Sequence, residues 1–274
     1  MGVTQREKAD RFRALHAGPG AFVIPNPWDA GSARLLAGLG FQALATSSAA
    51  SAAVLGRKDG GLTRAEALAH ARSIVDATDL PVSADLEHGF GDRPEVVAET
   101  IRMAAGAGLC GCTIEDATGD RAKPLYDFSL AVERIAAAAE AAQALEVPFV
   151  LTARAHNLLY PDATLDETIG RLKAYEKAGA DVLFAPGLAD LAAVATVCAA
   201  LSKPFNFMAG IKGTSFSVPE LARAGVRRIS LATSLYRAAM TGFLDAAREV
   251  LDKGRLDFID RSVTTPELHR LMGI

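Results

Sequence analysis

Residues 81–91 read PVSADLEHGFG, a short apolar run that changes abruptly into acidic and glycine-rich sequence. Residues 107–116, AGLCGCTIED, follow the same plan, with a helix-ending Ala-Gly pair, an apolar run and two acids. Runs that are apolar almost throughout are typical of parallel strands covered on both faces. The two stretches therefore predict neighbouring buried strands, each with polar residues at its carboxyl end.

Six more apolar runs of strand length alternate with alanine-rich amphipathic runs of helix length. The eight predicted strands are Phe22–Pro25, Ala43–Ser47, Val82–Glu87, Gly111–Glu115, Phe149–Ala153, Val182–Ala185, Phe205–Met208 and Arg228–Ala232. No linker or change of composition divides the chain. Eight βα units favour an α/β fold of the (β/α)₈ TIM-barrel type over an open doubly wound sheet, as a single domain over residues 1–274.

Helix signals support this plan. Thr63–Glu66, Thr164–Glu167 and Ser217–Glu220 each place a hydroxyl three residues before a glutamate, which predicts a capping box. Residues 4–17 predict an extra helix before the barrel, and the segment after Lys253 predicts a loop and a short final helix.

Composition excludes several classes of function. The formal net charge of -3 and the pI near 6.0 do not suggest a nucleic acid or an anionic membrane as a partner. No apolar run approaches the roughly 20 residues that span a bilayer, and the charged start of the chain is unlike a signal peptide. Three cysteines argue against a disulfide framework and indicate a cytoplasmic protein, without a zinc site.

Acidic residues gather where two successive predicted strands end. Asp85 and Glu87 alternate with Leu86, so we expect them on one side of the third strand, and Glu115 ends the fourth. In a barrel of this kind the active site lies at the carboxyl ends of the strands. Carboxylates crowded there favour a hard divalent cation, Mg²⁺ or Mn²⁺. The alternative is a solvated acidic loop.

Other strand ends carry candidate substrate contacts. Arg154 could hold a carboxylate or phosphonate through its bidentate guanidinium, or could pair with Glu115 or Asp85. His156 is a substrate contact or a loop cap. Thr46, Ser47 and Ser48 could form an anion nest or a closely packed turn. Trp28 could form a pocket wall, cap the barrel or pack on a neighbouring subunit. The seventh strand supplies Asn206, and of Arg227 and Arg228 on the eighth, one could be a packing or surface residue.

Taken together, the stretches NPWDAGSARLLAGLGFQALATSS, LGRKDGG, PVSADLEHGFGD, AGAGLCGCTIEDA, LTARAHN and KAGADVLFAPG resemble the isocitrate lyase / phosphoenolpyruvate mutase superfamily. The resemblance runs from about Pro25 to Arg237. It implies a magnesium-dependent lyase that binds a small 2-oxo acid and breaks or forms a bond beta to the carboxylate through a stabilised enolate. Relatives exchange the eighth helix between subunits, which implies a homodimer or homotetramer here.

The resemblance also implies roles for single residues. Asp85 corresponds to the main metal ligand, and Glu87 and Glu115 to acids that act through water. Arg154 matches the arginine that holds the substrate carboxylate, and residues 46–48 match the segment that binds the oxo-acid end. Asp59 matches a supporting acid, and Asn206 a position near the substrate tail.

The loop at residues 116–127 departs from the isocitrate lyases because it lacks their catalytic cysteine. It is closer to the mutase, phosphonopyruvate hydrolase and oxaloacetate decarboxylase branches, and its Arg121 and Lys123 could close over the substrate. The candidate catalytic residues are therefore Arg154, Glu115, His156 and Lys123. Alternatives to a carbon–carbon lyase are a phosphonate P–C enzyme, a non-catalytic 2-oxo acid binder, and a phosphosugar barrel with a phosphate cradle at 208–213.

Overall fold

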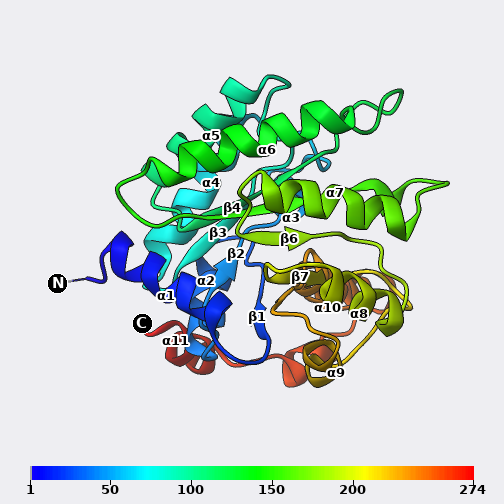
Figure 1. Ribbon diagram of the computed structural model, residues 1–274. Helices are drawn as coiled ribbons and strands as arrows, with labels where there is room; N and C mark the ends of the chain where they lie inside the picture. The colour runs from blue at the N-terminus through cyan, green and yellow to red at the C-terminus, as the bar shows by residue number, and fades with distance from the viewer. Residues whose placement is uncertain (1) are drawn as a thin grey trace.

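Eight parallel strands form a nearly closed barrel in the computed structural model, which describes residues 2–274 (Figure 1). The strands are β1 (Phe22–Ile24), β2 (Leu44–Ala45), β3 (Val82–Asp85), β4 (Gly111–Glu115), β5 (Val150–Arg154), β6 (Val182–Phe184), β7 (Phe205–Met208) and β8 (Arg228–Ser230). Each pairs with its neighbours in the order β1-β8-β7-β6-β5-β4-β3-β2. A hydrogen bond of 3.0 Å from the Ala45 amide to the Pro25 carbonyl joins the two remaining edges. The predicted (β/α)₈ fold is confirmed.

Helices surround the barrel. They are α1 (Gln5–Ala17), α2 (Ala30–Gly38), α3 (Ser48–Val54), α4 (Arg64–Ala77), α5 (Pro94–Gly106), α6 (Phe128–Gln143), α7 (Leu165–Lys177), α8 (Leu191–Ala200), α9 (Val218–Arg223), α10 (Ser234–Lys253) and α11 (Thr265–Met272), with 3₁₀ turns at Asn157–Leu159 and Asp257–Arg261. Reciprocal capping boxes begin α4 at Thr63 and α9 at Ser217 as predicted. At α7 the Thr164 hydroxyl accepts from the Glu167 amide. No helix among the described residues is both long enough and apolar enough to cross a bilayer.

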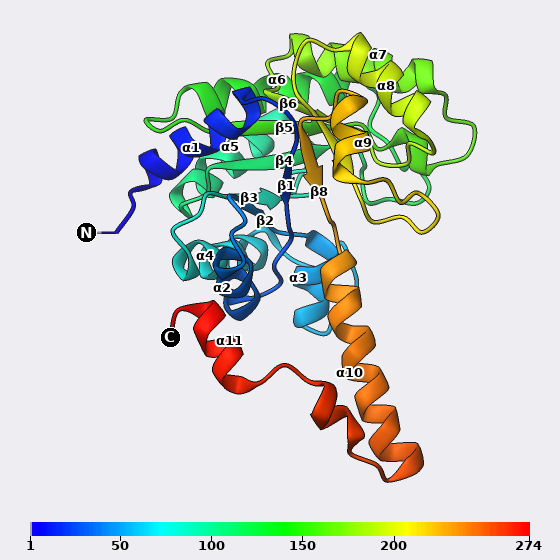
Figure 2. The same cartoon turned by 90° about the horizontal axis from the view of Figure 1, so that it is seen from below.

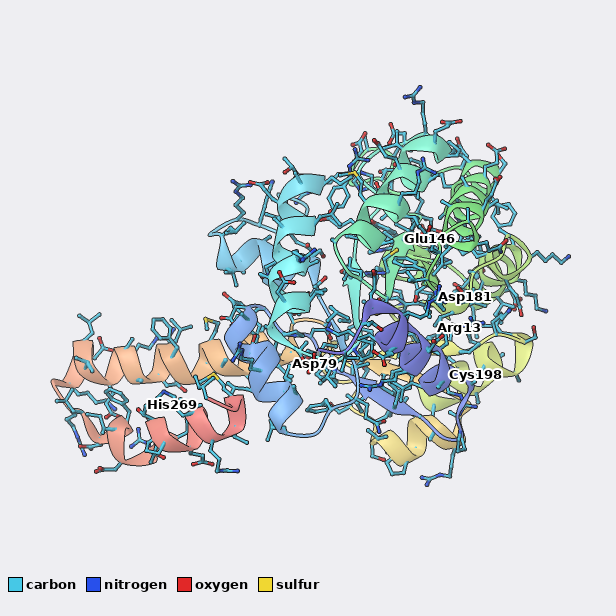
Figure 3. The ribbon with its side chains drawn as sticks, turned by 90° about the vertical axis from the view of Figure 1, so that its left-hand side faces the viewer. Arg13, Asp79, Glu146, Asp181, Cys198 and His269 are labelled. Carbon is cyan, nitrogen blue, oxygen red and sulfur yellow. The ribbon has the colours of Figure 1, made fainter. Side chains whose placement is uncertain are left out.

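Helix α1 is the predicted extra helix, and it closes the amino end of the barrel. Its Phe12 is fully buried among Ile24, Val150 and Val182. Gly111 leaves room for it, because a Cβ there would lie 3.1 Å from the Phe12 ring. Figure 3 shows α1, which carries Arg13, lying across this end, with Asp181 beside it. Ligands can therefore enter the barrel from the carboxyl end of the strands.

Helix α10 projects away from the barrel, and the chain then returns so that α11 packs on α2 (Figure 2). No residue of α10 is buried, although its helix is amphipathic. Its exposed large apolar side chains are Phe243, Leu244, Val250 and Leu251, and Leu251 is 85% exposed. The projecting arm formed by residues 234–274 thus presents an apolar surface to its surroundings.

Strand boundaries differ from the prediction where polar residues begin. Strand β3 ends at Asp85, and Glu87 lies in a turn with φ of 50°, so the prediction that alternation places both on one strand face is wrong. Strand β2 is shorter than predicted, because the Ser47 side chain caps α3 directly after it. Strand β5 extends to Arg154, which therefore faces the barrel interior with Thr152.

Candidate active site

A cavity of about 220 Å³ opens at the carboxyl end of the barrel, lined by residues from all eight strands. Its lining includes Asp85, Arg154 and Asn206 together with the loop residues Thr46–Ser48 and Asp59. The fold thus gathers seven of the residues that the sequence marks as candidates. The cavity is smaller than the roughly 300–1,000 Å³ typical of drug-sized ligands, so it suits a small metabolite.

Asp85 is the acid at the centre of the cavity wall. Its Oδ2 accepts hydrogen bonds from the Ser48 amide at 3.3 Å and the Ser48 hydroxyl at 3.1 Å. Its Oδ1 accepts from the Glu87 amide at 3.3 Å. Burial raises the pKa of Asp85, and the neighbouring charges of Glu115 and Asp59 raise it further while Arg154 opposes them. The Asp85 carboxylate is therefore fixed by hydrogen bonds, but its negative charge is only partly compensated by Arg154.

Glu87 approaches the same point from the turn after β3. Its Oε2 lies 3.8 Å from where a Cβ on Gly60 would stand, which places it beside the 59–60 loop. Burial, followed by the charges of Asp85, Asp59 and Glu115, raises its pKa to about 8. Asp59 joins Asp85, Glu87 and Glu115, so four acids repel one another at this end of the barrel, three of them at the strand ends where the sequence predicts acids.

Glu115 has a different environment. The Arg154 guanidinium lies 3.2 Å from Glu115 Oε2, and His156 Nδ1 lies 3.3 Å from the same oxygen. Burial alone would raise the pKa of Glu115, but Arg154, His156 and His88 lower it to about 2. The predicted alternative of an ion pair between Arg154 and Glu115 is therefore present. The Phe184 ring packs 4.9 Å from the guanidinium carbon and fixes its plane.

The hydroxyl segment after β2 supports the acids. The Thr46 hydroxyl accepts from the Asp85 amide at 3.1 Å, and the Ser47 hydroxyl accepts from the Ala50 amide at the start of α3. Ser48 donates to Asp85 itself. This segment is a compact turn whose hydroxyls orient Asp85, and it lines the cavity.

Whether these residues suit a divalent cation can be judged from the donor set. Within residues 2–274, no three His, Cys, Asp or Glu side chains converge as a ready-made set of metal ligands. Mg²⁺ does not need one, since it commonly keeps several waters and binds one or two carboxylates plus the substrate. Asp85 and Glu87, whose pKa values are raised first by burial and then by the neighbouring acids, suit that mode of binding.

Five of the candidates do not line the cavity. Glu87 and Glu115 contact the lining residues Asp85 and Arg154, and His156 contacts Glu115.

Lys123 and Trp28 have other partners. Lys123 is exposed, and its ammonium group contacts Asp127 at 2.8 Å. Trp28 packs edge-on against Tyr236 of α10 at 5.6 Å between ring centroids, which identifies it as a contact to the projecting arm. Asp116, next to Glu115, turns outward and is bound by Arg171 and Tyr175 of α7. Each of these side chains already has a partner on the exterior of the barrel.

Sequence reasoning left the two arginines of β8 undecided. Arg227 points outward and donates to the carbonyls of Gly18 and Gly20, the latter at 2.5 Å. Arg228 points inward and lines the cavity. Its Nε donates to Asn206 Oδ1 at 2.8 Å. The alternation of side chains along a strand separates such neighbours, but it does not show which of the two faces the barrel interior.

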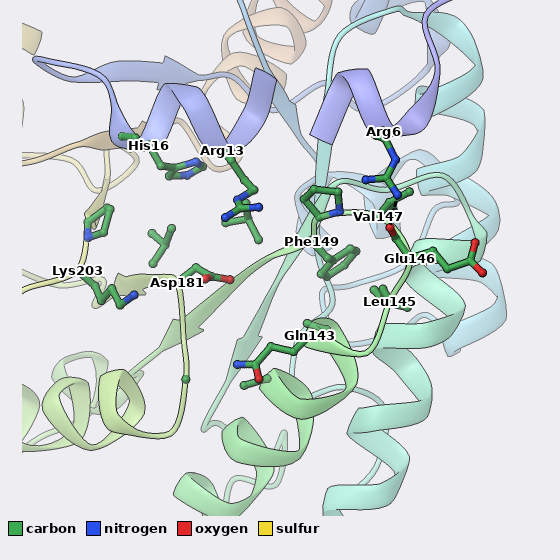
Figure 4. Close-up of a pocket in the computed structure, with 18 residues that line it drawn as sticks. Arg6, Arg13, His16, Gln143, Leu145, Glu146, Val147, Phe149, Asp181 and Lys203 are labelled. Carbon is green, nitrogen blue, oxygen red and sulfur yellow. Dashed lines mark hydrogen bonds between the residues drawn. The ribbon is translucent and has the colours of Figure 1, made fainter. Parts of the chain in front are cut away.

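A larger cavity, of about 600 Å³, lies at the opposite end of the barrel between α1 and the segment after α6 (Figure 4). Arg13, Asp181 and Lys203 point toward it, whereas Glu146 points away. Active sites of these barrels occupy the carboxyl end, and residues at the amino end serve stability. Since Phe12 of α1 separates this cavity from the barrel interior, we assign the active site to the smaller one.

Comparison with known proteins identifies the family of this chain. A family model described as phosphoenolpyruvate phosphomutase matches residues 12–251. A probable 2-methylisocitrate lyase of Corynebacterium glutamicum is 32% identical over 99% of this chain and 90% of its own length. An oxaloacetate decarboxylase of Ectopseudomonas mendocina is 32% identical over 91% of this chain and 88% of its own.

Solved structures extend the match to the whole fold. A crystal structure of a Burkholderia cenocepacia J2315 protein, provisionally assigned as a lyase or mutase, is 51% identical with a TM-score of 0.96. The match covers 98% of this chain and 97% of that one. Relatives in this group are lyases and mutases. The chain belongs to the phosphoenolpyruvate phosphomutase family, and so to the phosphoenolpyruvate mutase/isocitrate lyase superfamily of enzymes.

Proposed function

We propose that this enzyme is a Mg²⁺- or Mn²⁺-dependent lyase that cleaves a bond beta to the carboxylate of a small 2-oxo acid, in the manner of an oxaloacetate decarboxylase. The observation that carries the proposal is the crowding of Asp85, Glu87 and Glu115 next to Arg154 at the carboxyl end of the barrel. A cation would relieve the repulsion between the acids, and an arginine beside them would attract an anionic substrate.

The residues divide the work between cation and substrate. In this proposal Asp85 binds the metal directly, and Glu87 and Glu115 bind its waters. The bound metal would supply Lewis-acid stabilisation of the negative charge that develops on the keto oxygen. Arg154 binds the substrate carboxylate, and the Ser47 amide donates to the oxo-acid end, because the Thr46 and Ser48 amides already donate to Ser83 and Asp85.

Glu115 and His156 position Arg154 and do not contact the bond that breaks. Glu115 holds Arg154 at 3.2 Å, and His156 contacts the same carboxylate from the other side. We propose that His156 fixes Glu115, which in turn sets the direction in which Arg154 presents its free N–H groups. Lys123 could take part only after exchanging Asp127 for the substrate, through a movement of the 116–127 loop.

Substitution of Asp85 tests the proposal. We expect Asp85→Asn to reduce Mg²⁺-dependent turnover by at least about 100-fold, because the amide carries no charge for the cation. Turnover is measured with oxaloacetate, short alkyl-substituted relatives and phosphonopyruvate, each with Mg²⁺ and with a chelator. The matched control is Asp10→Asn on the exposed face of α1, which should leave turnover unchanged.

Turnover by Asp85→Asn at the wild-type rate would defeat the proposal. Consumption of phosphonopyruvate alone would assign the site to P–C chemistry instead. Mg²⁺-dependent binding without consumption of any compound in the series would identify a 2-oxo acid binding protein.

We also propose that the enzyme is a homodimer or a homotetramer built through the projecting arm. The support is the exposure of Phe243, Leu244 and Leu251 on α10, since large contiguous apolar surfaces on soluble proteins mark interaction sites. Along its outer half α10 meets the returning segment of this chain, where Glu249 bonds to Phe258 and Arg261, and Figure 2 shows that both project away from the barrel. A second copy would cover the same surface on both arms, as in a twofold-symmetric interface.

A further inference from the structure

Arg228 is a buried cation for which residues 2–274 provide no acid. Its side chain is only 4% exposed, and it forms no ion pair with any described carboxylate. One of its nitrogens, Nε, donates to Asn206 at 2.8 Å. Its Nη1 is enclosed and has no hydrogen-bond partner. Burial alone lowers the pKa of Arg228 to about 9, and no carboxylate raises it.

The other deeply buried arginines of this chain are fully engaged. Arg134 donates to the carbonyls of His88, Gly91 and Asp92 and stacks on a tyrosine ring. Arg171 binds two acids, Asp116 and Glu167. Taking a guanidinium out of water without partners costs several kcal/mol, so an unpaired one is not explained by packing. An apolar residue would fill the same space at less cost.

The position of Arg228 connects it with the active site. It lines the 220 Å³ cavity together with Asn206, Ser230, Ser83 and Thr113, which make the deep part of that cavity polar. Asn206 is itself held, because its Nδ2 donates to the Ser230 hydroxyl at 3.1 Å. The amide therefore orients the guanidinium through Nε and leaves its Nη groups for another acceptor.

The cavity contains two cations that differ in one respect. Arg154 already has a carboxylate, Glu115, at 3.2 Å. Arg228 has none, although a guanidinium normally binds a carboxylate through two parallel hydrogen bonds. We propose that Arg228, oriented by Asn206, binds a second carboxylate of the substrate, so that the enzyme selects short 2-oxo dicarboxylic acids over 2-oxo monocarboxylic acids. This inference rests on the proposed function, in which the oxo-acid end lies at Asp85 and Arg154.

Binding measurements with inert ligands test this selectivity. Calorimetry in Mg²⁺ compares the Kd of 2-oxoglutarate with that of 2-oxohexanoate, and the Kd of 2-oxoadipate with that of 2-oxoheptanoate. In each pair an ethyl group replaces the terminal carboxylate. Oxalate serves as a ligand for the metal end alone. We expect the wild-type enzyme to bind at least one diacid about 10- to 100-fold more tightly than its monoacid, the range of a charge-assisted hydrogen bond.

In Arg228→Met we expect that ratio to fall below about threefold, while the Kd of oxalate stays within threefold of the wild-type value. The matched control is Arg227→Met, which changes the neighbouring arginine that faces outward and should keep the full ratio. Arg228→Lys, which keeps the charge without the planar fork, should give an intermediate ratio and serves if Arg228→Met does not fold. Circular dichroism checks the fold of each variant.

Wild-type enzyme that binds oxalate with Mg²⁺ but shows no diacid preference would overturn the inference and leave the proposed function standing. The inference is also overturned if Arg228→Met, or Arg228→Lys in its place, keeps the wild-type ratio. Failure of wild-type enzyme to bind oxalate in a Mg²⁺-dependent way would overturn the proposed function itself, together with the inference built on it.

Discussion

Glu87 and Glu115 are both carboxylates at the carboxyl end of the barrel, yet their neighbours move their pKa values in opposite directions. Burial and the charges of Asp85 and Asp59 raise the pKa of Glu87 to about 8. Glu115 is buried too, but Arg154 and His156 lower its pKa to about 2. A lowered carboxyl pKa contributes stability above the unfolded value near 4.5, and that stability is lost as the pH falls toward 2. Glu115 therefore stays charged throughout the working range.

At the other end of the barrel, His16 predicts a loss of stability in mild acid. Burial lowers the pKa of His16 from 6.5 to about 3, helped by the charge of Arg228. Between about pH 6.5 and pH 3, His16 is protonated in the unfolded chain but neutral in the folded chain. The free energy of unfolding therefore falls as the pH drops below about 6.5 and stops falling near 3. Between pH 7 and pH 5 the protonation of His16 should lower the free energy of unfolding by about 2 kcal/mol.

Urea unfolding at the two pH values measures this difference, and His16→Leu should remove about 2 kcal/mol of the pH dependence. His269→Leu, which changes an exposed histidine of α11, is the control and should keep the wild-type dependence. Equal pH dependence in wild type and His16→Leu would show that His16 is not held neutral in the folded state.

The sequence predicted side chains well when their role depended on strand position. Asp85 and Arg154 end apolar runs and Asn206 lies within one, and the fold brings all three to one cavity. Local partners could not be predicted from strand position, such as Asp127 for Lys123 and Tyr236 of α10 for Trp28. Arg228 was not singled out because the predicted start of the strand, which agrees with the observed one, does not show which arginine faces inward.

Among the elements, α11 depends on a single glycine for its contact with α2. Gly38 ends α2, and a Cβ there would collide with the backbone carbonyl of Leu271. Backbone atoms cannot move aside as a flexible side chain can. We therefore expect Gly38→Ala to displace α11 and to raise the hydrogen-exchange rates of the amides in residues 265–272.

The matched control for this effect is Gly170→Ala in α7. A Cβ at Gly170 would meet nothing within 4 Å, so this change should stabilise the helix by about 0.5–1 kcal/mol and leave α11 as it is. Unchanged exchange in Gly38→Ala would mean that α11 does not pack on α2 in solution.

Element positions were predictable from periodicity, and their ends were less so. The bounds of β4 and β7 agree with the prediction residue for residue. Strand β3 ends two residues early, because Glu87 adopts a left-handed conformation that no local pattern indicates. Capping residues were the most reliable signals, since Thr63 and Ser217 act through bonds to residues only three positions away.

At the scale of the whole molecule, the projecting arm predicts self-association. Leu251 is 85% and Phe243 63% exposed in the single chain. We expect Leu251→Glu to shift the enzyme from a dimer or tetramer toward monomer in sedimentation velocity, because a charge at a buried interface is costly. Met103→Glu, an equivalent change at an exposed site on α5, should leave the assembly intact. Wild-type protein that sediments only as a monomer would contradict the role of the arm.

The barrel itself was the most predictable feature, because eight repeats of one pattern constrain each other. A single apolar run is ambiguous between strand and buried helix, whereas eight that alternate with helices leave few topologies. The direction of α10 was not predictable from the chain alone. Its amphipathic pattern favours a covered face, yet among the described residues none of α10 is buried.

A crystal structure grown with Mg²⁺ and oxalate tests most directly whether the acids at the carboxyl end of the barrel hold a cation that binds the substrate. We predict a cation about 2.1 Å from a carboxylate oxygen of Asp85 and coordinated by oxalate, with waters linking it to Glu87 and Glu115. The oxalate should accept hydrogen bonds from Arg154 and the 46–48 turn. Oxalate and cation bound elsewhere, with Asp85 still engaged only by Ser48 and the Glu87 amide, would contradict this assignment.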